Sequence, residues 1–227
     1  MAVDMFHYNE IARAIRLVCQ GAVALTADVS EGTQVSVGSN ELFEAGQTVT
    51  LRDSAGEESA TVQQTIGLTT VVLDGEIGGE YLVSRGARLE RAGDGLPDLQ
   101  WVGQGSPELM PRSPASRYPC VLVKPDTMRQ PLNEGSNRTF QQDYHLKVFY
   151  VERYEEGQQA NIEALERAGG VFNAIMEDPY LGGSCWHSQV VEVEPEPAVQ
   201  DRLREMERPL RVVEMTVLAR RAAVFNG

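Results

Sequence analysis

The sequence has few cysteines and no long apolar run. Cys19, Cys120 and Cys185 are odd in number and far apart, so they lack the close spacing of metal or redox pairs. No apolar stretch approaches the roughly 20 residues that a membrane helix needs, and Asp4 stands where a signal peptide would carry basic charge. These absences predict buried free thiols in a soluble protein that is not exported and is made in a reducing cytoplasm.

Motifs for metals and nucleotides are also missing. The histidines His7, His145 and His187 form neither an HExxH nor an HxH arrangement, so no metal site is expected. The glycine pairs fit neither GxGxxG nor GxxxxGK[ST], which are the two common phosphate cradles. We therefore expect no metal and no cofactor.

The balance of charge is acidic. Asp and Glu number 33 against 20 Lys and Arg, which gives a formal net charge of -13. Such a surface repels polyanions, so sequence-specific recognition of DNA is not expected. An acidic wall along which DNA slides without binding remains compatible with this charge.

One pair of residues could in principle carry covalent chemistry. Cys185 and His187 flank Trp186, and residues two apart on a strand share a face, so the thiol and imidazole could act as nucleophile and base. No glycine-rich nucleophile turn surrounds the thiol, and no orienting carboxamide is evident. We favour a structural role for both residues and expect that the protein is not an enzyme.

The chain is organised in three stretches. Apolar residues at helical spacing predict a helix from about Asp4 to Gln20, ended by Gly21. From Thr33 to Arg91 the apolar period changes to two, with short runs separated by glycine-rich turns, which predicts a small barrel or sandwich. Glycine and proline then dominate from Gly93 to Pro119 and indicate a linker or an ordered surface loop.

The last stretch alternates strands with a helix. Helical spacing over Asn161–Asp178 predicts an amphipathic helix with Leu165 and Phe172 in the core, and Gly169 and Gly170 are expected to permit close packing on a sheet. Strands are expected at Tyr118–Lys124, Asp143–Tyr154, Ser188–Glu194 and Leu210–Arg221.

These patterns predict an α+β fold: a mostly antiparallel sheet with two helices covering one face, plus an inserted small all-β domain. The expected boundaries are 1–28 and 112–227 for the α+β domain, 29–92 for the inserted β domain and 93–111 for the linker.

The opening helix and the last half of the chain resemble the tail-terminator family of long-tailed bacteriophages, proteins of the neck where head and tail join. The resemblance is a pattern of elements and not an invariant motif. It rests on the opening helix with Ile11, Arg13, Ile15 and Arg16, on YPCVLVKP (Tyr118–Pro125), on DYHLKVFYV (Asp143–Val151), on NIEALERAGGVFNAIMED (Asn161–Asp178) and on LRVVEMTVLARR (Leu210–Arg221). The inserted β domain departs from the family.

The resemblance implies a structural virion protein without catalytic activity, assembled in the host cytoplasm and located at the tail or neck. It implies a ring, most often hexameric, that caps the tail tube and contacts the head connector, with DNA passing through the lumen. Ring closure needs head-to-tail contacts between unlike patches. The candidate interface residues come from two long segments of opposite charge and are Arg129, Asn133, Arg138, Glu192, Glu194 and Glu196.

Alternative functions stay open at this point. Glu192, Glu194 and Glu196 could bind calcium or form a hydrolase pair, although a solvated strand end that blocks edge-to-edge aggregation explains them more simply. The whole chain could instead be a non-viral adaptor whose β domain grips a peptide or glycan, or a hydrolase that uses Cys185 and His187.

Overall fold

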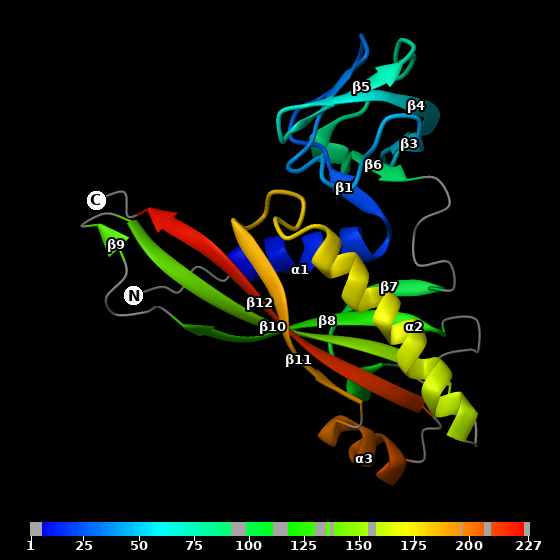
Figure 1. The fold of residues 1–227 in the computed structure, drawn as a ribbon, viewed down its shortest axis with the longest axis vertical. Helices are drawn as coiled ribbons and strands as arrows, with labels where there is room; N and C mark the ends of the chain where they lie inside the picture. Colours follow the sequence, from blue (N-terminus) through cyan, green and yellow to red (C-terminus); the bar gives the residue numbers. More distant parts are fainter. Residues whose placement is uncertain are drawn as a thin grey trace.

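A computed structural model describes residues 6–91, 99–110, 118–129, 135–136, 139–153, 158–195, 197–206 and 210–224. These residues contain three α-helices and two β-sheets (Figure 1). The helices are α1 (Phe6–Cys19), α2 (Gln158–Glu177) and α3 (Ala198–Glu205). The predicted α+β class with mostly antiparallel strand pairs is confirmed.

The first sheet is built from residues 22–91 and is antiparallel throughout. Its strands are β1 (Ala22–Ala24), β2 (Gln34–Ser36), β3 (Thr48–Arg52), β4 (Glu57–Ile66), β5 (Thr70–Asp74) and β6 (Arg88–Arg91). They lie in the order β1-β6-β3-β4-β5-β2. Alternate residues face inward, as the period of two predicts: Val49 and Leu51 of β3 are buried between exposed or half-buried neighbours.

This sheet differs from the prediction at both ends. It begins at Ala22, inside the range 1–28 that was assigned to the other domain, because Val23 of β1 pairs with Leu89 of β6. The run at Tyr81 to Val83 is not a strand: Tyr81 forms an isolated bridge with Val29, and a 3-10 helix, η1 (Val83–Arg85), follows. Buried residues of this sheet, of α1 and of the second sheet belong to one continuous hydrophobic cluster.

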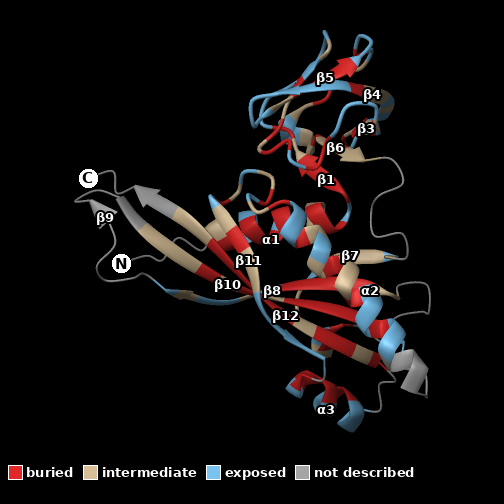
Figure 2. Ribbon diagram, in the orientation of Figure 1, coloured by how far each residue is buried: buried red, intermediate tan, exposed pale blue. Residues whose placement is uncertain are grey.

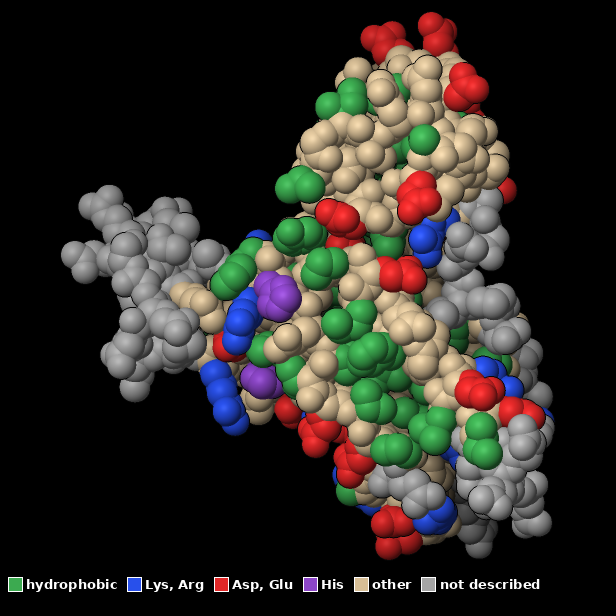
Figure 3. All heavy atoms as spheres, viewed as in Figure 1, with side chains coloured by type: hydrophobic (Ala, Val, Ile, Leu, Met, Phe, Trp, Pro, Cys, Tyr) green, Lys and Arg blue, Asp and Glu red, His purple; other side chains and the backbone are tan. Residues whose placement is uncertain are grey.

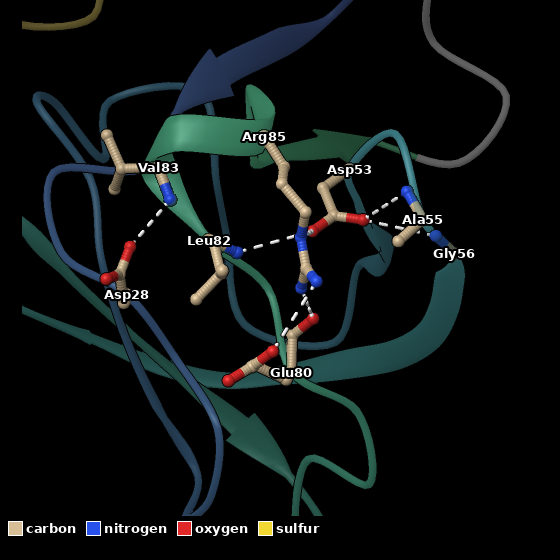
Figure 4. A network of polar contacts seen from close by, with 8 residues as sticks. All are labelled: Asp28, Asp53, Ala55, Gly56, Glu80, Leu82, Val83 and Arg85. Atoms are coloured by element: carbon tan, nitrogen blue, oxygen red, sulfur yellow. Dashed lines mark hydrogen bonds and ion pairs between the residues drawn. The ribbon is translucent and has the colours of Figure 1, made fainter.

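A buried polar network holds η1 against the turn between β3 and β4 (Figure 4). The Asp53 carboxylate accepts hydrogen bonds from the backbone N–H groups of Ala55 (2.7 Å), Gly56 (3.1 Å) and Leu82 (3.3 Å) and from Arg85 Nε (2.6 Å). Burial alone would raise the pKa of Asp53, but these donors outweigh it and hold the pKa below its usual value. The network therefore stabilises the ionised carboxylate.

The second sheet contains the longest strands. Its strands are β7 (Trp101–Gln104), β8 (Cys120–Arg129), β9 (Gly135–Ser136), β10 (Thr139–Arg153), β11 (His187–Glu194) and β12 (Leu210–Val224). Their order is β11-β12-β10-β8-β7, with β9 paired to β10. Strands β10 and β12 pair along their whole length. The four strands predicted in this stretch correspond to β8, β10, β11 and β12 and are confirmed.

The predicted linker 93–111 contributes an edge strand to this sheet. Within its described residues, β7 pairs in parallel with β8, and a 3-10 helix, η2 (Pro107–Leu109), follows. Gly103 is buried in β7, and a Cβ at this position would collide with the indole ring of Trp101. The glycine that suggested a linker is thus required for close packing within a strand.

Helices α1 and α2 lie in contact with each other on one face of the second sheet, and this face is largely buried (Figure 2). They pack on strand residues such as Val121, Tyr150 and Val213. The buried helix residues include Ile11, Ile15 and Val18 of α1 and Ala164, Ala168, Val171 and Ile175 of α2.

A third helix, absent from the prediction of two, covers the opposite face. Val199 and Leu203 of α3 pack against Leu122 and Phe149, whose side chains point away from α1 and α2. This helix lies in the acidic segment between β11 and β12, which was expected to be only a connection. It has eight residues and few apolar side chains, so its helical period is weak in the sequence.

The predicted core face of α2 is wrong for Leu165, which is 42% exposed. Phe172 is partly buried and packs against the core, and Ala168, Val171 and Ile175 are the residues that face the sheet. An added Cβ at Gly169 would meet no atom within 4 Å, so this glycine does not serve close packing on the sheet. The helix therefore carries two apolar faces, and the prediction chose the one with the larger side chains.

Candidate interaction surface

The second apolar face of α2 continues onto β11 to form an exposed surface, here called the α2–β11 surface. Its members are apolar side chains that are between about a third and a half exposed. Figure 3 shows hydrophobic side chains gathered over these two elements. The α2–β11 surface comprises Ile162, Leu165, Met176, Tyr180, Trp186, Val191 and Val193.

Helical geometry sets the position of this surface. The exposed residues Ile162, Leu165 and Met176 lie in line with Phe172, at spacings of three, seven and four residues, and so share one stripe. This stripe lies roughly 100° around the helix axis from the stripe that faces the sheet. The Met176 sulfur accepts a hydrogen bond from the Val190 N–H at 3.5 Å, so the stripe faces β11.

Strand β11 is the terminal strand of its sheet, and among the described residues the contacts on its outer edge fall in its first part. There Ser188 donates its N–H to the Pro179 carbonyl oxygen at 2.6 Å. The pairing with β12 then shifts between Val190 and Glu192, which leaves Val191 as a bulge. From Val191 to Glu194 every residue of the strand is exposed.

Glu192 and Glu194, two of the predicted interface residues, lie on the same face of β11. They pair in register with Thr216 and Glu214, whereas Val193 faces the α2 side. The Thr216 hydroxyl donates to Glu192 Oε2 at 3.4 Å, and Lys147 Nζ lies 2.5 Å from Glu214 Oε1. The two glutamates therefore border the apolar surface from the other face of the same strand.

The remaining predicted interface residues are not gathered around this surface. Arg129 is exposed at the end of β8, opposite Asp143, and β8 is separated from β11 by β10 and β12. Asn133, Arg138 and Glu196 lie outside the described residues. Within one subunit the structure does not bring Arg129 together with the β11 glutamates.

Two basic residues, Arg13 and Arg16, lie along one stripe of α1, and Arg13 lines a cavity together with Leu181, Gly182 and Ser184. Asn9, Arg13, Arg16 and Gln20 share this stripe, and Gln104 of β7 donates a hydrogen bond to Asn9 at 3.3 Å. Burial and the nearby Arg13 charge both lower the pKa of Arg16. Among the described residues neither arginine has an ion-pair partner.

The contacts of the described residues do not join the Cys185 thiol to the His187 ring. Burial raises the pKa of the Cys185 thiol to about 12, so it stays protonated at neutral pH. The thiol lies 3.8 Å from the Pro179 carbonyl oxygen. The thiol is therefore poorly placed to act as a nucleophile.

Two features are absent from the described part of the chain. It contains no group of three or more His, Cys, Asp or Glu side chains that could hold a metal ion. No helix in it has the length and apolar character needed to cross a membrane.

A buried carboxyl group lies where the two sheets meet. Asp178 follows α2, is fully buried, and accepts hydrogen bonds from the N–H groups of Gly182 (2.5 Å) and Tyr180 (3.1 Å). Ser39, from the first sheet, also hydrogen-bonds to it. Burial nevertheless raises the pKa of Asp178 above its usual value.

This shift gives a prediction with a definite sign. Because the folded-state pKa of Asp178 is raised, its contribution to stability is full below the unfolded pKa of about 3.9 and is lost as pH rises through the folded pKa. Asp178→Asn cannot ionise, so its unfolding free energy should improve relative to wild type between about pH 4 and pH 7. Urea titrations across this range measure the difference.

Asp53→Asn is the control with opposite sign, because the lowered pKa of Asp53 gives stability that is lost as pH falls. The unfolding free energy of Asp53→Asn should therefore fall furthest below that of wild type near neutral pH. If the unfolding free energies of Asp178→Asn and wild type differ by the same amount at every pH, the raised pKa of Asp178 is contradicted.

The chain matches no protein-family model, and a search of the curated proteins finds no significant match.

Proposed function

We propose that the chain is a structural protein of a bacteriophage virion, copies of which form a ring that caps the tail tube and joins it to the head connector. The order of elements supports this proposal: α1, then β8 and β10, then α2, then β11 and β12 follow one another as the resemblance to tail terminators implies. In this proposal the first sheet, residues 22–91, is an inserted all-β domain.

The observation that carries the proposal is the α2–β11 surface at the open edge of this sheet. Contiguous exposed apolar side chains mark sites of protein–protein contact, and every subunit of a ring needs such a contact. The partners are further copies of the chain, the tail tube protein and the head connector. DNA passes through the lumen without sequence-specific contact, which suits a net charge of -13.

Two alternatives have less support. A Cys185 hydrolase requires a reactive thiolate, which burial of this thiol disfavours. A non-viral adaptor shares the need for an exposed binding surface, but it requires no contact between copies of the chain.

Antibody labelling tests where the protein lies in the virion. Gold-labelled antibodies against the purified protein should decorate the head–tail joint of virions of the phage that encodes the chain, as seen by electron microscopy. Antibodies against the major tail protein serve as the positive control along the tube. Virions that contain the chain at another position, or lack it altogether, would contradict the proposal.

A further inference from the structure

A cavity lies where α1 meets the first sheet and the turn between α2 and β11. Its walls come from α1, from β1 and from residues 181–184, and its volume is about 120 Å³. The turn lies beside α1 in Figure 1, between the two sheets. The cavity belongs to a single copy of the chain, so a ligand in it does not depend on the proposed ring.

The buried part of the cavity wall is apolar. Ala14 and Val18 of α1, Val23 of β1 and Leu181 of the turn line it, and all four are buried. Ala14 and Val18 are one helical turn apart and so point to the same side of α1. Gly182 keeps the turn close to β1, because a Cβ at this position would lie 3.1 Å from Cγ1 of Val23. This part of the wall suits a small hydrocarbon group.

The rim of the cavity carries charge. Arg13 lines it, is exposed, and has no ion-pair partner among the described residues. Glu10 also lines the cavity, but it pairs with Arg221 and lies 3.3 Å from His7 Nδ1. Burial, and then repulsion from Arg13, lower the pKa of Arg16, which adds a second positive charge nearby. An unpaired guanidinium therefore stands beside the apolar wall.

We propose that this cavity binds a short aliphatic carboxylate, whose hydrocarbon chain fills the apolar part and whose carboxylate pairs with Arg13. A guanidinium can form two parallel hydrogen bonds with a carboxylate, and these are stronger than hydrogen bonds between neutral groups.

Size and charge restrict the ligand. A cavity of about 150 Å³ holds a benzene-sized molecule, whereas pockets for drug-sized ligands measure roughly 300–1,000 Å³. The volume of the cavity therefore suits a molecule such as isovalerate and is too small for a nucleotide. A chain of net charge -13 repels anions over most of its surface, so an anion needs an apolar group to bury in addition to its charge.

Two kinds of molecule carry such a group. One is a free branched acid, of which isovalerate is an example. The other is the C-terminal valine or leucine of a polypeptide, which also presents a carboxylate beside a branched hydrocarbon. The chemistry recognised by the cavity is the same in both.

Titration of the isotope-labelled full chain with isovalerate, followed by nuclear magnetic resonance, tests the proposal. The amide signals of Gly182 and Ser184 should shift and saturate, with a dissociation constant on the order of 1 mM, because so small a ligand has few atoms that can contribute free energy. Isoamyl alcohol has the same carbon skeleton without the charge, and acetate has the charge with little hydrocarbon. Each should bind about tenfold more weakly or worse.

Three variants assign the binding to this cavity. Arg13→Gln should weaken isovalerate binding about tenfold or more and leave the binding of isoamyl alcohol unchanged, which a merely structural role would not do. Ser184→Leu fills the cavity from the turn and should abolish the binding of both; if it does not fold, Ala14→Leu fills the cavity from α1. Arg153→Gln is the matched control and should bind like wild type, because Arg153 is an exposed arginine at the end of β10 without an ion-pair partner among the described residues.

The peptide acetyl-Gly-Gly-Val and its C-terminal amide distinguish the two sources. If the free-acid peptide binds more tightly than isovalerate, and the amide does not bind, the ligand is a polypeptide C-terminus; if isovalerate binds more tightly than the peptide, it is a free acid. The proposal is overturned if isoamyl alcohol or acetate binds as tightly as isovalerate, if Arg13→Gln binds isovalerate like wild type, or if the Gly182 and Ser184 signals show no saturable shift.

Discussion

Replacing Gly38 with alanine should destabilise the protein strongly, because the added methyl group would collide with backbone atoms. A Cβ at this position would lie far inside van der Waals contact of the Gly182 carbonyl oxygen and 2.7 Å from its carbonyl carbon. Both are backbone atoms of the turn after α2, so no side chain can rotate away. Overpacking of this kind costs about 1–3 kcal/mol, and more where the backbone must move.

Gly56→Ala is the matched control for Gly38→Ala. Gly56 lies in the same sheet, in the turn between β3 and β4, and an added Cβ would meet no atom within 4 Å. Urea titration should show a clear loss of unfolding free energy for Gly38→Ala and an unfolding free energy close to that of wild type for Gly56→Ala. Equal curves would mean that the first sheet does not approach the Gly182 turn as the structure shows.

Truncating Ile175 to alanine should cost about 2–5 kcal/mol of unfolding free energy, because a fully buried branched side chain would leave a cavity against the sheet. The measurement is a denaturant titration at protein concentrations low enough to prevent self-association. This result follows from the observed orientation of α2, which differs from the orientation expected from the sequence.

Leu165→Ala is the control on the same helix, since Leu165 is 42% exposed and its loss should cost no more than about 1 kcal/mol. Ile175 and Leu165 are similar in size and lie on the same helix. The expected difference between the two variants therefore comes from the face of the helix that each residue occupies. A larger loss at Leu165 than at Ile175 would show that the helix is rotated relative to the sheet.

The strands of the second sheet could be predicted because their side chains alternate over long runs. In β10 the residues Tyr144, Leu146, Val148 and Tyr150 are all fully or almost fully buried on one face, and this period of two is visible in the sequence. The same alternation located β8, β11 and β12. Edge strand β7 was hidden, because its four residues include a glycine and lie beside further glycines and prolines.

The orientation of α2 could not be predicted for a different physical reason. Its buried face carries small residues, Ala164 and Ala168, beside Val171 and Ile175, whereas its exposed face carries larger ones. Hydrophobicity alone favours the larger side chains as core. The exposed apolar stripe is therefore a signal of the interaction surface, and only the position of the sheet shows which stripe is free.

The candidate contact was predicted in part. Glu192 and Glu194 alternate on an edge strand as expected, and they border the α2–β11 surface. The arginines Arg13 and Arg16 were noted only within the opening helix, because their lack of an ion-pair partner among the described residues depends on the packing of α1. Spacing along the sequence carries no information about such long-range pairing.

Negative-stain electron microscopy of the purified wild-type chain in low salt tests whether the protein is a ring subunit. We predict closed rings with an open lumen and one uniform number of copies, which light scattering of the same sample should confirm as a single mass. Addition of salt should loosen them gradually, because partly exposed ion pairs are individually weak. Particles that remain monomeric over the whole range of concentration, with no ring at any salt, would contradict the proposal.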